Sequence, residues 1–142
     1  SDKEKLYKAV LEEHLTTVGQ DLRKISETSD VTFQQTLTAM ARYLIDSHLV
    51  DLFMMLHDLK QNISSETRNH LFALWKKNYR EPFEVIFSKN REALRENVTQ
   101  EIAARHFFLI LSPYITQAGN SVEKSMTVEQ LIDLYLHGVI SE

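Results

Sequence analysis

The stretch Thr127–Glu142, TVEQLIDLYLHGVISE, decides the fold. Apolar residues recur at helical spacing and form one stripe with two leucines beside it: Val128, Leu131, Ile132, Tyr135 and Val139, then Leu134 and Leu136. A helix that docks on its own core needs one apolar stripe, so the surplus predicts a second packing partner. Thr127 and Gln130 form a capping box, and we expect Gly138 to end the helix in the left-handed conformation.

The preceding stretch, EIAARHFFLILSPYITQ (101–117), also predicts a helix, and it is apolar on two faces. One face carries Ile102, His106, Leu109 and Pro113. The other face carries Ala103, Phe107, Ile110, Leu111 and Tyr114. The two last helices together therefore have more apolar surface than one core covers.

Composition favours an all-α fold of about six helices in a single domain, 1–142. Gly 3 and Pro 2 among 142 residues are too few for the frequent turns of a sheet protein. The 20 acidic residues outnumber the 16 basic ones, which argues against nucleic-acid binding by this chain alone. No apolar run is long enough to span a membrane, and the start, SDKEKL, lacks the apolar core of a signal peptide, so a cytoplasmic location is expected.

The first half of the chain divides into three predicted helices. The first begins with the capping box Ser1-x-x-Glu4, and its apolar stripe is Leu6, Val10, His14, Val18, Leu22 and Ile25. Asp30 is expected to cap the second, whose stripe is Phe33, Leu37, Met40, Leu44 and His48. A short third helix is expected over 49–59.

A fourth helix opens at NISSE (62–66). Its predicted inward residues are Leu71, Leu74, Trp75, Asn78, Val85 and Ile86. Pro82 lies inside it, where proline removes a hydrogen bond and clashes with the carbonyl four residues back. We therefore expect a kink near Asn78–Pro82.

Catalytic and metal-binding patterns are weak. The six histidines include no H-E-x-x-H pair, and a histidine on an apolar helix face is more often a hydrogen-bonded core residue than a ligand. There is no cysteine, no nucleophile motif and no glycine-rich phosphate loop. The sequence thus predicts neither an enzyme nor a resident metal or cofactor.

A small-molecule pocket is the more specific hypothesis. Several predicted inward residues are aromatic, flexible or polar: Met40, Tyr43, Leu44, Phe53, Trp75, Asn78, Tyr79 and His106. Polar groups placed in an apolar interior are unfavourable unless they are paired or meet a polar ligand. Apolar walls with a few convergent polar groups are the usual form of a ligand site. No Arg or Lys cluster faces inward, so the ligand is expected to be apolar or aromatic.

Four segments, in this order, resemble the effector domain of TetR-family transcriptional regulators. SDKEKLYKAVLEEHL (1–15) resembles the exit from the DNA-binding head, and HLVDLFMMLHDLKQN (48–62) the short third helix of that domain. LWKKNYREPFEVIF (74–87) resembles the long helix with a mid-helix proline, and LIDLYLHGV (131–139) the family's L-x-D-L-x-L-x-G ending.

The resemblance implies a homodimer that senses a small-molecule effector. In the family the last two helices of each chain form a four-helix interface. That arrangement assigns the interface to Ala103, Phe107, Ile110, Leu111, Tyr114, Val128, Leu131, Ile132 and Tyr135. The helix-turn-helix head is missing from these 142 residues. Operator DNA would therefore be bound only through that missing head, and we expect no specific DNA binding by residues 1–142.

A second reading stays open. An all-α protein-interaction module with a dry core would use the LIDLYLHGV face to bind a protein partner and would have no effector.

Overall fold

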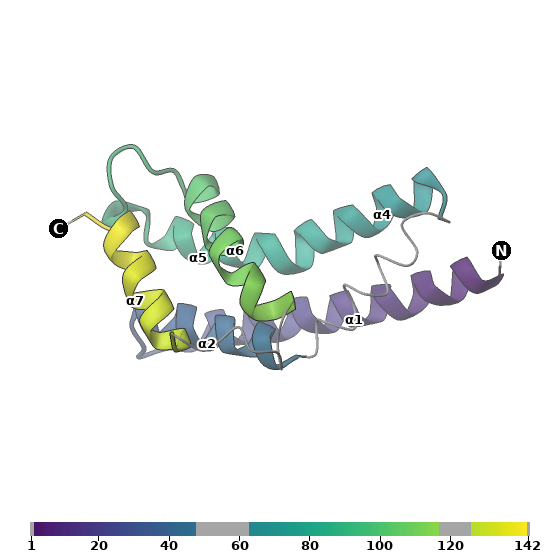
Figure 1. Ribbon diagram of the computed structural model, residues 1–142, viewed down its shortest axis with the longest axis horizontal. Coiled ribbons are helices and arrows are strands. Elements are labelled where there is room, and N and C mark those ends of the chain that lie inside the picture. Colours follow the sequence, from purple (N-terminus) through teal and green to yellow (C-terminus); the bar gives the residue numbers. More distant parts are fainter. Residues whose placement is uncertain (1, 48–62, 117–125, 142) are drawn as a thin grey trace.

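The computed structural model describes residues 2–47, 63–116 and 126–141, and its regular elements there are helices (Figure 1). They are α1 (Asp2–Ser26), α2 (Phe33–Asp46), α4 (Ser65–Trp75), the π-helical turn η1 (Lys76–Arg80), α5 (Glu81–Lys89), the 3₁₀ turn η2 (Arg91–Ala93), α6 (Gln100–Thr116) and α7 (Val128–Val139). The all-α prediction is confirmed. The expected third helix, 49–59 with Phe53, lies outside the described residues, as does His48 of the second predicted stripe. In the described ranges no helix combines the length and apolarity needed to cross a membrane.

Helices α1 and α4 run side by side in the same direction (Figure 1). Polar contacts join them along their length. The Ser64 backbone N–H donates to the Glu4 carboxylate at 2.8 Å, and Glu12 Oε1 lies 2.7 Å from His70 Nε2. The predicted capping box of Ser1 and Glu4 cannot be followed, because Ser1 lies outside the described residues. The Glu4 carboxylate instead accepts from the backbone N–H of Ser64, the N-cap of α4.

The buried face of α1 matches the predicted stripe in Val18 and Leu22 and differs from it in the first half of the helix. The buried apolar side chains are Leu11, Leu15, Val18 and Leu22, whereas Leu6 is 63% and Val10 44% exposed. Because α4 covers the side of α1 that carries Glu4 and Glu12, the core-facing line is rotated towards Leu11 and Leu15. The first turns of α1 also extend beyond the other helices, together with α4 (Figure 1).

Helix α2 begins two residues later than predicted. Thr32, not Asp30, is the N-cap, and it forms a capping box with Gln35. Asp30 instead adopts a positive φ of 63° in the preceding turn, a conformation that Asp tolerates better than most residues. Three residues of the predicted stripe, Leu37, Met40 and Leu44, are fully buried, Phe33 is half-buried, and His48 lies outside the described residues.

Where a kink was predicted, near Asn78–Pro82, the structure has a π-helical turn directly before the proline. Ser64 caps α4, and the chain then makes the π-turn η1 before α5 starts with Pro82 in its first turn. Pro82 has no N–H for the carbonyl four residues back, and the π-turn directly before it accommodates this loss. Val85, predicted to face inward, is 43% exposed.

Helix α7 closes the core where α1, α2, α5 and α6 meet (Figure 1). Thr127 and Gln130 form the predicted capping box. The Arg42–Glu129 ion pair ties α7 to α2. Gly138 does not end the helix in a left-handed conformation as predicted, because α7 continues to Val139 and Ile140 is its extended cap.

Candidate ligand site at the π-turn

The structure buries four of the eight predicted pocket residues and half-buries two more. Met40 and Leu44 are inaccessible, Asn78 and Tyr79 are buried, and Tyr43 and Trp75 are half-buried. Phe53 lies outside the described residues. The prediction that His106 faces inward is wrong: it is exposed on α6, with its ring 5.6 Å from that of Tyr135.

The π-turn brings two consecutive buried side chains, Asn78 and Tyr79, against α1. A Cβ added at Gly19 would lie 2.0 Å from Asn78 Oδ1, so only glycine allows α1 to approach this closely. Asn78 donates to the Leu74 carbonyl at 2.9 Å. A π-turn presents side chains at a different angle from an α-helix and often marks a functional site.

The hydroxyl of Tyr79 has no hydrogen-bond partner although the side chain is only 1% exposed. Burial, and then the neighbouring Tyr43, raise its pKa well above the ordinary value, so the hydroxyl stays protonated. Tyr43 is satisfied, because it donates to Asp21 at 2.7 Å. Burial and then Asp21 raise the pKa of Tyr43 as well. A buried hydroxyl without a partner is unfavourable, and such a group calls for an explanation.

The Tyr79 ring is one end of a chain of aromatic contacts that runs through Trp75 and Phe108 to Phe83. The Trp75 ring lies 6.3 Å from Tyr79 and 6.0 Å from Phe108, which in turn lies 5.0 Å from Phe83. Phe108 was absent from the predicted site. The consecutive pair Phe107-Phe108 was the available signal, because neighbouring residues on a helix point about 100° apart, and here both rings contact Phe83 while only Phe108 contacts Trp75.

Two further polar atoms near these elements lack hydrogen bonds. The first is His14 Nε2 on α1, which is buried. His14 lies on the same side of α1 as Asp21, the partner of Tyr43, two helical turns away. Arg80 Nε is also unpartnered, since the Glu84 carboxylate is 3.6 Å away, and the guanidinium lies 5.8 Å from the centre of the Trp75 ring. Tyr79, His14 and Arg80 account for all unpartnered buried side-chain polar atoms in the described part of the chain.

The predicted interface residues divide into two groups. Five are buried inside one chain: Ala103, Phe107, Leu111, Ile132 and Tyr135. The half-buried ones are Ile110, Tyr114, Val128 and Leu131. A side chain with no accessible surface cannot contact a second copy, so the first group belongs to the core. There the Phe107 ring packs 5.2 Å from both Phe83 and Tyr135.

The opposite face of α6 is the exposed one. It carries Ile102, His106, Leu109 and Pro113, of which Leu109 is 68% exposed. Leu134 of α7 is 60% exposed. Both faces of α6 are apolar in sequence, and the Tyr135 hydroxyl, which donates to the Ala103 carbonyl, fixes which one turns inward.

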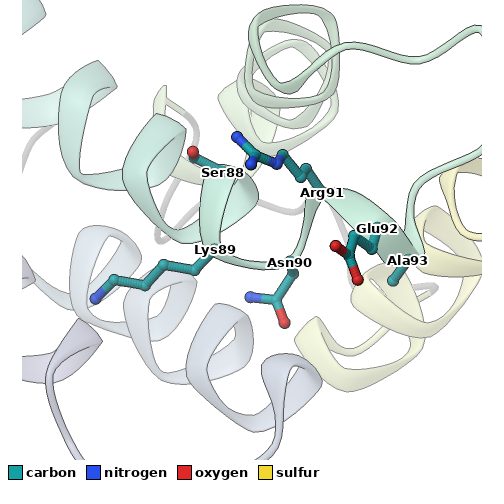
Figure 2. Close-up of a pocket in the computed structure, with 6 residues that line it drawn as sticks. All are labelled: Ser88, Lys89, Asn90, Arg91, Glu92 and Ala93. Atoms are coloured by element: carbon teal, nitrogen blue, oxygen red, sulfur yellow. The ribbon is translucent and has the colours of Figure 1, made fainter.

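A shallow depression of about 590 Å³ lies at the end of α5, lined by Ser88, Lys89, Asn90, Arg91, Glu92 and Ala93 (Figure 2). These six residues are consecutive, and their side chains point in different directions rather than converging on one point (Figure 2). The depression therefore lacks the convergent polar groups of a ligand site. Within 2–47, 63–116 and 126–141 no cluster of His, Asp and Glu side chains could hold a metal ion.

Comparisons with protein-family models, with curated proteins and with solved structures found no match.

Proposed function

We propose that this chain is a ligand-sensing and homodimerisation domain of a TetR-like, cytoplasmic transcriptional regulator, with no catalytic role. The observation that carries the sensing part is the unpartnered, buried hydroxyl of Tyr79, whose ring contacts Trp75, which in turn contacts Phe108. Natural proteins satisfy nearly all buried polar groups, and exceptions concentrate at functional sites. A small molecule bound between α1, α2, η1 and α6 supplies the missing partner.

The first experiment follows a neutral aromatic probe, N-phenyl-1-naphthylamine, by energy transfer from Trp75. Trp75 is the only tryptophan, so all energy transfer to the probe starts from this one ring, and the variants locate the probe. Saturable binding is expected in the wild type. Phe108→Ala removes the ring beside Trp75 and is expected to weaken the probe about tenfold.

Leu109→Ala is the matched control, because it changes the next residue on the exposed side of the same helix. It is expected to leave the affinity for the probe unchanged. If Leu109→Ala weakens the probe and Phe108→Ala does not, the probe binds on the outer face of α6. That result would contradict an interior site and favour the protein-interaction reading.

The dimer part of the proposal rests on the outer face of α6 and on Leu134. Ile102 and Leu109 lie on one side of α6, seven residues or two turns apart, and both are more than half exposed. Large apolar side chains grouped on the surface are typical of interfaces. The proposed occupant is a second copy, since a two-fold interface uses the same patch twice.

Sedimentation velocity at micromolar concentration tests this part, with a dimer expected. Leu109→Asp should yield a folded monomer, because the charge is introduced at an exposed position. Phe72→Asp is the control: Phe72 is also exposed, but it lies on α4, and the dimer should persist. A monomeric wild type, or dissociation by both variants alike, would contradict the proposed interface.

Operator DNA enters the proposal only through a head outside these 142 residues. Anisotropy titration at physiological salt should detect no sequence-specific binding by residues 1–142, because acidic residues outnumber basic ones.

A further inference from the structure

We infer that the ligand of this site is an uncharged aromatic molecule with an acceptor, such as a carbonyl oxygen, that accepts a hydrogen bond from the Tyr79 hydroxyl. The inference rests on the proposed sensing function and names its ligand class. It is carried by three features of the described residues: the unpartnered hydroxyl, the rings beside it and the charges around it.

The hydroxyl group sets the need for an acceptor. Tyr79 is 1% exposed and its oxygen has no partner, whereas the neighbouring Tyr43 hydroxyl is already engaged by Asp21 at 2.7 Å. Because Tyr79 holds its proton more tightly than an ordinary tyrosine, it is available as a donor across the physiological pH range. A ligand without an acceptor would leave this donor unsatisfied.

The rings set the shape of the ligand. Trp75 lies between Tyr79 at 6.3 Å and Phe108 at 6.0 Å, both in tilted arrangements. Aromatic pairs favour offset or edge-to-face geometry at such separations. A planar ligand ring can therefore join this group while its polar edge meets the Tyr79 hydroxyl.

The charges disfavour an anion near Tyr43 and a cation at the Trp75 ring. No ion pair joins Asp21 to a Lys, Arg or His side chain in the described part of the chain, so its negative charge opposes an anion near Tyr43. Arg80 already lies over the Trp75 ring and faces Glu84 at 3.6 Å. A cationic ligand at that ring would meet a like charge, and an anionic one would find the guanidinium already opposed by a carboxylate.

The test measures displacement of N-phenyl-1-naphthylamine by three compounds that share one ring system. Naphthalene lacks an acceptor, 2-acetylnaphthalene carries a neutral one, and 2-naphthoate carries a charged one. The wild type should bind 2-acetylnaphthalene about tenfold more tightly than naphthalene, as expected for one added hydrogen bond. It should bind 2-naphthoate more weakly than 2-acetylnaphthalene.

Two tyrosine variants assign the preference. Tyr79→Phe should bind naphthalene and 2-acetylnaphthalene equally, while Tyr135→Phe should keep the wild-type preference because that hydroxyl is bonded to Ala103. Equal binding of the two neutral compounds by the wild type, tightest binding of 2-naphthoate, or an unchanged preference in Tyr79→Phe would each overturn the inference. The wild-type series alone decides it if a variant fails to fold. Failure of the naphthylamine probe to bind at all would instead contradict the proposed function.

Discussion

Replacing Tyr79 by phenylalanine should stabilise the protein, although it removes a polar group from a buried tyrosine. The ring and its packing remain, and only the unpartnered oxygen is lost. An unsatisfied buried polar group costs about 1–3 kcal/mol, so the free energy of unfolding should rise by roughly 1 kcal/mol after some relaxation of the surroundings.

Tyr135→Phe provides the matched comparison. Tyr135 is also buried, but its hydroxyl donates to the Ala103 carbonyl. Losing a satisfied hydrogen bond lowers the free energy of unfolding by about 1 kcal/mol. The same chemical change should therefore have opposite signs at the two sites, separating the variants by about 2 kcal/mol, or roughly 4–8 °C in Tm for a domain of this size.

Urea unfolding followed by circular dichroism and by Trp75 emission measures this difference. Both variants should keep the wild-type dependence on urea, since neither changes the surface exposed on unfolding by much. If Tyr79→Phe is destabilised as much as Tyr135→Phe, the Tyr79 hydroxyl has a partner in solution. The ligand site would then lose the observation on which it rests.

Two further predictions concern backbone approach and alkaline pH. Gly19→Ala should lower the free energy of unfolding by about 1–3 kcal/mol, because the new Cβ meets Asn78 Oδ1 at 2.0 Å. Gly138→Ala, where the new Cβ has nothing within 4 Å, should raise it by up to about 1 kcal/mol. Thermal melts that show the same sign for both variants would refute the close approach of α1 to Asn78. Burial raises the pKa of Tyr79 and Tyr135, so the folded state keeps protons that the unfolded chain releases near pH 10, and stability should fall as pH rises above about 10. Urea titrations from pH 8 to 11 should show that fall and a shallower slope in either Phe variant, and a pH-independent result would contradict the burial of these hydroxyls.

Local signals predicted part of the fold because they act within a few residues. The Thr127 capping box, the helix start within NISSE (62–66) and a departure from regular helix before Pro82 all depend on neighbouring groups, and all are present. The predicted N-cap of α2, Asp30, was wrong, because Asp30 and Thr32 are both good capping residues and the sequence does not distinguish them. Only the turn conformation, with Asp30 at positive φ, selects between them.

The choice between helix faces could not be predicted, because it depends on contacts made far along the chain. Helix α6 has two apolar faces, and periodicity does not say which one the Tyr135 ring covers. Consequently His106 was placed inside and Phe108 was missed. The face of α1 was likewise set by α4, through contacts such as Glu12 with His70. The unpartnered state of Tyr79 is a property of three-dimensional packing alone.

The most direct measurement of the central claim is a ¹H–¹⁵N correlation spectrum titrated with N-phenyl-1-naphthylamine. Trp75 contributes the single indole N–H signal. An interior site at the π-turn predicts saturable shifts of that signal, of the Asn78 and Tyr79 amides and of Tyr43. Shifts confined to the outer face of α6, around Leu109, with the indole signal unmoved, would contradict it.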